Sequence, residues 1–339
     1  MPEMPASFAE IRALFAHLPG PDLAAGTAAA LRERQLTKPA GALGRLEELA
    51  QWLATWQGHH PPRLDHPRTC VFAGNHGVAA RGVSAYPAAV TAQMVQNFIA
   101  GGAAVNQLCK VFDADLRVYE MNLEAPTADF VDAPALDESD CARAVAYGMM
   151  AVEPGLDVLA LGEMGIANTT SAAALCLALF GGSAEAWTGP GTGVAGAALD
   201  RKREVVAAAV ARHRDAAGDP LEWLRRLGGH ELAAICGAVL AARMGRVPVL
   251  LDGFACTAAA AVLHAVNPRA LDHCVVAHVS AEPGHRRLLD TIGKPALFDL
   301  GMRLGEASGA TLAIAVLKAA AACHNGMATF ADAGVSGPE

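Results

Sequence analysis

The chain of 339 residues is long enough to bury a large core, and this length suits one large α/β domain or one domain with a smaller satellite. Charged residues make up only 18% of it and hydrophobic residues 53%, which predicts extensive buried surface and an oligomer. The net charge of -8 argues against a partner rich in phosphate such as a nucleic acid, so we expect a small ligand.

Residues 8–56 carry no strand signal. Residues 1–18 contain neither a basic stretch nor an apolar run, so no export signal is expected, and no apolar window of the chain reaches the roughly 20 residues of a membrane helix. Leu43, Leu46, Leu49 and Leu53 follow helical spacing. We expect residues 1–62 to form a helical segment that packs with residues 308–339 as a small subdomain, beside an α/β catalytic domain of residues 63–307.

Five short apolar runs alternate with long helix-like stretches, at residues 69–73, 116–119, 156–161, 247–251 and 274–279. This rhythm predicts an α/β fold with a parallel sheet flanked by helices. Four of the runs lead into loops rich in glycine and polar residues, at 74–77, 162–165, 252–254 and 280–282. Because ligands of open α/β sheets bind outside the carboxyl ends of the strands, we expect these loops to converge on one crevice.

The third run leads into the most informative segment, residues 156–170. Its sequence predicts a strand, a glycine-bracketed turn and a helix that begins at Asn168, Thr169 and Thr170. Backbone N–H groups and the positive end of a helix dipole at such a turn favour an anion, above all a phosphate. Glu163 lies beside this anion site, which favours a phosphorylated ligand that also carries a cationic part, as a nucleotide-like substrate does.

A second glycine-rich turn, at residues 188–194, precedes a predicted helix that carries Lys202. Lys202 is either a phosphate ligand or a solvated surface lysine. The chain lacks the GxxxxGK[ST] pattern and a clean GxGxxG after a strand, so ATP and NAD sites are disfavoured.

Glu306 is a second lone acid among glycines, in residues 300–310. Together with Glu163 it would place two carboxyl groups in the predicted crevice. Such a pair serves general acid–base catalysis or stabilises developing positive charge at the anomeric carbon of a sugar.

His278, Glu282 and His285 allow an alternative, a metal-assisted hydrolase, although Pro283 and Gly284 interrupt the helix that would align the three as ligands. The eight cysteines occur singly and form no CxxC pair. They are typical of buried thiols in a reducing compartment, so a cytoplasmic location is expected.

Several of these segments, in order along nearly the whole chain, resemble the nicotinate-nucleotide:dimethylbenzimidazole phosphoribosyltransferases of cobamide lower-ligand assembly. The resemblance rests on the Glu163 and Glu306 loops and on further motifs: KPAGALGRLE at 38–47, AGNHGV at 73–78, GVS at 82–84, VTAQMV at 90–95, NFIAGGAA at 97–104, LGG at 227–229, DGF at 252–254, HVSAE at 278–282 and MATF at 327–330.

The resemblance implies a Rossmann-like sheet, a homodimer, and neither metal nor cofactor. Nicotinate mononucleotide and a benzimidazole-type base would be the substrates and α-ribazole 5′-phosphate the product. Glu306 would take the proton of the incoming base, and Glu163 would lie near the ribose. Phosphate and ribose contacts are expected from Gly165, Ile166, Ala167, Asn168, Thr169, Thr170, Gly191, Lys202, Gly253 and Phe254, and base contacts from Ser84, Gln93, Ser280 and Leu304.

For Glu306 to act as a base, we expect it to be partly desolvated, with a pKa raised towards neutrality. Ala167 stands where glycine is usual in such a loop, and its methyl group is expected to narrow the phosphate site or to disfavour a positive φ. A nucleotide-binding protein without catalysis is the other alternative, and such a protein would not need Glu306.

Overall fold

The computed structural model describes residues 4–215 and 219–337. At its centre lies a six-stranded sheet in the order β2-β1-β3-β4-β5-β6, in which every neighbouring pair is parallel. Its strands are β1 (Pro67–Ala73), β2 (Asp115–Glu120), β3 (Val158–Met164), β4 (Val249–Leu251), β5 (Cys274–His278) and β6 (Ala296–Phe298). The predicted α/β fold is confirmed. Strand β6 was not predicted from the sequence, because it is short and only half-buried. Strand β4 has the same length, but it is fully buried and belongs to the longer apolar run at residues 247–251.

Helices cover both faces of the sheet because its inner strands are apolar on both sides. On β3, Val158 and Ala160 face one helical layer, whereas Leu159 and Leu161 face the other. The first layer holds α3 (Arg45–Gln57), α4 (Val90–Ala100), α5 (Ala104–Phe112) and α14 (Ser308–Gly326). The second holds α6 (Glu138–Met149), α7 (Asn168–Phe180), α9 (Ala197–His213), α10 (Pro220–Leu227), α11 (His230–Met244) and α12 (Phe254–Val266).

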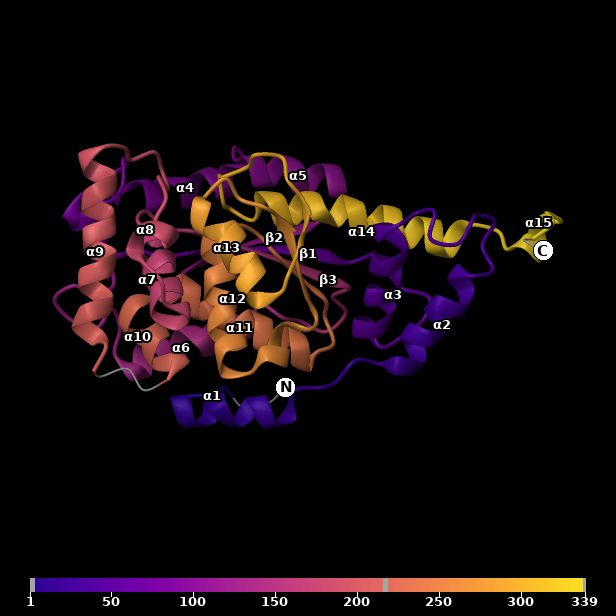
Figure 1. The fold of residues 1–339 in the computed structure, drawn as a ribbon, viewed down its shortest axis with the longest axis horizontal. Coiled ribbons are helices and arrows are strands. Elements are labelled where there is room, and N and C mark those ends of the chain that lie inside the picture. Colours follow the sequence, from indigo (N-terminus) through magenta and orange to yellow (C-terminus); the bar gives the residue numbers. More distant parts are fainter. Residues whose placement is uncertain (1–3, 216–218, 338–339) are drawn as a thin grey trace.

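Segments near the two ends of the chain come together at one end of the molecule. Helix α2 (Leu23–Glu33) packs on α3, α3 packs on α14, and Leu36 pairs with Thr329 in an isolated bridge just before α15 (Phe330–Ala333), as Figure 1 shows at its right. Helix α1 (Phe8–Leu14) contacts α6 instead, and the start of α14 packs against the sheet. The division at residues 62 and 308 stays a prediction.

Two further helices, α8 (Ala184–Trp187) and α13 (Pro283–Ile292), pack against α7 and α12 of the second layer. The 3-10 turns are η1 (Phe15–His17), η2 (Gly77–Arg81) and η3 (Pro268–Leu271). In the part of the chain that the structure describes, no helix has the length and apolar character needed to cross a membrane.

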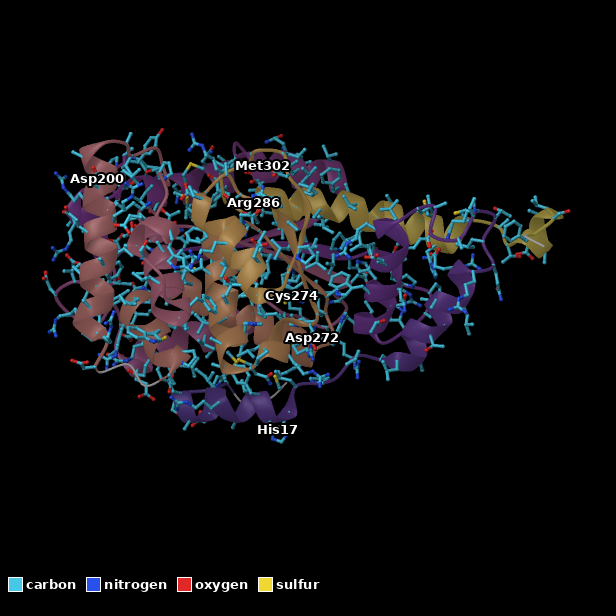
Figure 2. The ribbon with its side chains drawn as sticks, viewed as in Figure 1. His17, Asp200, Asp272, Cys274, Arg286 and Met302 are labelled. Carbon is cyan, nitrogen blue, oxygen red and sulfur yellow. The ribbon has the colours of Figure 1, made fainter. Side chains whose placement is uncertain are left out.

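The ends of the strands define two edges of the sheet. In Figure 2, Asp272 and Cys274 mark the amino end of β5, and Arg286 and Met302 lie towards its carboxyl end. Helices α2, α6 and α10 begin with an aspartate whose side chain accepts an N–H of the first turn. By contrast, α7, α12, α13 and α14 start at the carboxyl edge, and among the described residues no side chain caps them. This edge therefore collects the positive ends of four helices.

Candidate active site

A cavity of about 460 Å³ opens at the carboxyl edge, within the size range of small-molecule sites. Its wall combines the ends of β3, β4 and β5 with the starts of α7 and α12, part of α4 and the loop before α14. Three of the four loops expected to converge do so. The fourth loop, residues 74–77, does not line the cavity but lies directly behind Gly165. The two segments are so close that a Cβ on Gly165 would lie 2.8 Å from the Gly74 carbonyl oxygen.

Glu163 enters the cavity from the second-last position of β3. Its side chain is only 9% exposed and accepts a hydrogen bond from the Asn168 amide at the start of α7. Burial, reinforced by the negative charge of Asp252, raises the pKa of Glu163 to about 8, although the Asn168 amide opposes this rise. With this pKa, the Glu163 carboxyl group is largely protonated at neutral pH.

Glu306 reaches the same cavity from the loop before α14 and is 6% exposed. Its N–H donates to the Glu163 carbonyl oxygen at 3.1 Å, so the two acidic residues are joined through the backbone. Glycine at position 162 permits this contact, since a Cβ there would lie 2.1 Å from the Ala307 nitrogen. Burial, followed by the charge of Asp252, raises the pKa of Glu306 to about 7, which confirms the expected shift towards neutrality.

The expected phosphate loop lies between these acids and α7. Gly165, Ile166, Asn168 and Thr169 line the cavity, whereas Ala167 and Thr170 are buried behind them. Ala167 adopts φ 79°, so the alanine does take the left-handed conformation that it was expected to disfavour. Its methyl group lies outside the cavity lining and does not narrow the site.

The second glycine-rich turn contributes Gly191 to the cavity lining, and hydrogen bonds from Lys202 and Glu282 hold the turn in place. The Lys202 Nζ donates to the Thr169 Oγ1 at 2.8 Å and to the Gly189 carbonyl oxygen at 3.0 Å. On the other side, the Glu282 Oε1 accepts the Gly191 N–H at 2.7 Å. Lys202 is neither solvated nor in the cavity lining: it is buried, and this burial lowers its pKa to about 8.

Of the other residues expected to contact the substrates, some line the cavity and some lie outside its lining. Gly253, Phe254, Ser280 and Leu304 line the cavity. Ser84 contacts the Thr192 Oγ1 of the lining through its hydroxyl at 2.9 Å. Gln93 is exposed on α4 and lies outside the lining.

Several lining residues were not expected from the sequence. Arg303 lines the cavity and donates to the Gly191 carbonyl oxygen at 3.3 Å. Tyr86, Val90 and Met94 also line the cavity, and the sequence pattern could not reveal this, because only tertiary packing brings them to the site.

The residues of the metal alternative have separate partners. His285 accepts the Ser280 N–H at its Nδ1 (2.8 Å) and contacts the Thr257 hydroxyl through Nε2 (3.1 Å), whereas Glu282 holds the Gly191 turn. Within residues 4–215 and 219–337, no three His, Cys, Asp or Glu residues are grouped as metal ligands.

Comparisons with known proteins agree with this geometry. A family model described as phosphoribosyltransferase matches residues 18–335. The chain is 59% identical over 329 residues to the nicotinate-nucleotide–dimethylbenzimidazole phosphoribosyltransferase of Sinorhizobium medicae, and 57% identical over 330 residues to that of Brucella anthropi, with 97% of both chains covered in each case. A crystal structure of CobT from Thermus thermophilus superimposes with a TM-score of 0.87 at 42% identity, covering 93% of this chain and 100% of the other.

Proposed function

The chain belongs to the nicotinate-nucleotide–dimethylbenzimidazole phosphoribosyltransferase family, and from this membership we propose that it exchanges the nicotinate of nicotinate mononucleotide for 5,6-dimethylbenzimidazole or a related base. The product is α-ribazole 5′-phosphate, an intermediate for the nucleotide loop of cobalamin. The observation that carries the proposal is the pair of buried carboxyl groups beside a phosphate-type loop in one cavity.

The reaction forms one C–N bond and breaks another. A nitrogen lone pair of the benzimidazole attacks C1′ of the ribose, and the bond from C1′ to the pyridinium nitrogen breaks with its electron pair going to nicotinate. The proton on the other benzimidazole nitrogen then passes to Glu306. Because the leaving ring departs as a neutral pyridine, the reaction needs a base but no general acid for departure.

The raised pKa values of the two acids suit this sequence. A base with a pKa near 7 is partly ionised at neutral pH and still binds a proton usefully. The pyridinium charge of the bound nucleotide opposes the effect of burial and favours the ionised form of both glutamates. Glu163 then faces the ribose as positive charge develops at C1′.

The four helix starts at the carboxyl edge support binding of the phosphate there. We assign the phosphate and ribose to the Gly165–Thr170 segment, Gly191, Gly253 and Phe254, with Lys202 acting through Thr169 and the Gly189–Gly191 turn. The incoming base is assigned to the wall that holds Ser84, Ser280 and Leu304, and Gln93 would need to turn inward to join it.

A homodimer in the cytoplasm completes the proposal. Ile99 on α4, Val111 on α5 and Leu304 beside the cavity expose large apolar side chains, which supports burial against a second subunit. The eight free cysteines, seven of them buried, suit a reducing compartment. Sedimentation equilibrium should give twice the 34.8 kDa chain mass.

The deciding experiment incubates the purified protein with nicotinate mononucleotide and 5,6-dimethylbenzimidazole in the presence of EDTA. We expect nicotinate and α-ribazole 5′-phosphate in equal amounts by mass spectrometry. Nucleotide binding without either product, across several bases, would support a binding protein. Turnover that is lost with EDTA and restored by a divalent metal would support the metal alternative.

A further inference from the structure

Asp252 is a fully buried carboxyl group for which the reaction just described has no role. It follows β4 directly, and its side chain is 0% exposed. Its Oδ1 accepts the Ala310 N–H of the first turn of α14 at 2.9 Å. No hydrogen-bond partner of its Oδ2 is found among the described residues. A buried carboxyl group with one unpartnered oxygen is costly, which calls for a functional explanation.

The backbone fixes Asp252 beside both reactive acids. Its N–H donates to the Leu161 carbonyl oxygen at 3.1 Å, two residues before Glu163 on β3. Its side chain holds Ala310, four residues after Glu306. Since the Glu306 N–H also bonds the Glu163 carbonyl oxygen, the three acidic residues form one hydrogen-bonded unit of strand ends and helix start.

His278 is the basic side chain within reach of Asp252. Its Nδ1 lies 3.6 Å from the Asp252 Oδ1, and the ring is 1% exposed in the cavity wall. Neither ring nitrogen forms a hydrogen bond within the described part of the chain. Glycine at position 309 makes room for the ring, because a Cβ there would lie 2.0 Å from the His278 Nδ1. The ring and the start of α14 thus enclose the Asp252 carboxyl group.

We propose that Asp252 is a positioning residue: its buried negative charge, held by His278 and α14, sets the pH range in which Glu306 accepts the proton of the incoming base. The inference rests on the proposed function and deepens it. Asp252 touches neither substrate, and it acts on the reaction only through the field at Glu306 and Glu163.

Charge and burial support this assignment. After burial itself, the charge of Asp252 is the largest influence that raises the pKa of Glu306, and the same order holds for Glu163. Burial raises the pKa of Asp252 too, while His278 and the N–H groups of Ala310, Gly309 and Gly253 favour its ionised form.

The other ionisable groups around this unit come from every element packed against it. They are His76 after β1, Lys202 on α9, Glu231 on α11, Cys256 on α12, Glu282 and His285 at α13, and Arg303 before α14. Of these, Lys202 and Arg303 bond the glycine-rich turn around Gly189 and Gly191. Among the described residues, His278 is the basic side chain in contact with Asp252.

The test is the pH dependence of kcat/KM in Asp252→Asn, which keeps the shape of the side chain and removes its charge. The acid limb should move to lower pH by about half to one unit, because Glu306 loses a proton more readily without a neighbouring negative charge. At a pH below the acid limb of the wild type, kcat/KM of the variant, expressed as a fraction of its own maximum, should be about three to ten times that of the wild type. That maximum should fall, because the base is weaker.

Asp157→Asn is the matched control. Asp157 is also buried and precedes β3 at the opposite edge of the sheet, where it accepts the Asp65 and His66 N–H groups at 2.7 and 2.8 Å. The acid limb of the kcat/KM profile of Asp157→Asn should coincide with that of the wild type. The titrations of the substrates themselves are common to all three proteins and cancel in the comparison.

An unshifted limb in Asp252→Asn, or a shift to higher pH, would overturn the inference. Asp252→Ser, which is neutral and can still accept the Ala310 N–H, replaces Asp252→Asn if that variant does not fold. A titration of the Glu306 carboxyl carbon by NMR, assigned with Glu306→Gln, needs no turnover. It therefore tests the charge effect separately from the proposed reaction, whose own failure would appear as absence of product in the wild type.

Discussion

Three residues at the cavity hold a backbone conformation that L-amino acids seldom adopt. Ala167, Glu306 and Ala307 have φ of 79°, 61° and 58°, and they lie where α7 and α14 begin. Each such conformation costs about 1 kcal/mol or more and persists only where surrounding contacts enforce it. The Glu306 N–H bond to Glu163 is one such contact. These turns let α7 begin directly after Ala167 and place Glu306 just before α14, without a glycine at any of the three positions.

Ala167→Gly tests whether relief of backbone strain at this residue offsets the loss of the methyl group. Glycine relieves roughly 1 to 2 kcal/mol of strain from the left-handed conformation. Against this, the greater entropy of glycine in the unfolded chain costs about 0.7 kcal/mol of stability, and loss of the buried methyl group costs about 0.8 kcal/mol. The free energy of unfolding in urea should therefore change by less than about 0.5 kcal/mol. Ala173→Gly, inside α7 and equally buried, has no strain to relieve and should lose roughly 1.5 to 2 kcal/mol. Equal losses at the two positions would contradict the strain argument.

Glu306→Gln tests the chemistry at residue scale. The amide fits the same space but cannot accept the proton, so kcat should fall about 10² to 10⁴-fold. Nicotinate mononucleotide should still bind within a few fold by calorimetry, since the phosphate loop is untouched. Glu48→Gln, an exposed acid on α3, should retain full activity. Turnover retained in Glu306→Gln would exclude Glu306 as the base.

At the scale of elements, the contact between α6 and α11 depends on two glycines. A Cβ on Gly237 of α11 would lie 1.8 Å from the Val145 carbonyl oxygen, and one on Gly148 of α6 would lie 1.8 Å from that of Ala234. The helices therefore approach backbone to backbone. This pair lies on the face of the sheet opposite α14, so it supports β1 and β3 from behind the site.

Gly237→Ala should destabilise the protein by roughly 1 to 3 kcal/mol, because the helices must move apart and disturb the packed layer. Urea unfolding measures this loss. Gly326→Ala is the control: this glycine ends α14, and no atom lies within 4 Å of an added Cβ, so its effect should stay within about 0.5 kcal/mol. A Gly237→Ala variant as stable as the control would show that the two helices can separate at little cost.

At the scale of the whole molecule, the strand order explains where the site lies. The chain builds β1 and β2 towards one edge and then returns to add β3 on the other side of β1, followed by β4, β5 and β6. Such a reversal leaves a crevice at the carboxyl ends of the strands. The cavity lies there, at the ends of β3, β4 and β5. The sheet thus brings together residues as distant in the chain as Tyr86 and Glu306.

The buried acids should also make global stability depend on pH. Glu163 and Glu306 have ordinary pKa values near 4.5, raised in the folded protein to about 8 and about 7. The folded state binds their protons more tightly, so their contribution is fully present below pH 4.5 and is lost as pH rises through 7 to 8. Each carboxyl contributes a slope of about 1.4 kcal/mol per pH unit within its window.

Thermal unfolding of wild type and Glu163→Gln between about pH 5 and 9 measures this effect. The melting temperature of the wild type should fall more steeply over this range, and the variant should be the more stable protein at its alkaline end. Burial lowers the pKa of His273 and His285 to about 3, which costs stability only as pH falls below their usual range, and both proteins share that effect. Parallel curves would show that Glu163 is not held protonated in the fold.

The sequence by itself determined the local structure and most of the chemistry. The apolar runs of β1 to β5, the turn at Glu163, the helix that starts at Asn168 and the second acid at Glu306 were all predicted, because periodicity and glycine-rich turns are local properties. The family resemblance added the reaction, which no spacing of residues specifies.

Only the tertiary structure decided how these parts meet. It placed Lys202 behind the Gly189–Gly191 turn instead of in the cavity, put the loop after β1 one layer beneath Gly165, and left Gln93 outside the lining. It also showed Asp252 beside both acids, a residue that the sequence presents only as part of a turn. Burial, and with it the pKa of each acid, depends on contacts between residues far apart in the chain, and a local pattern cannot report them.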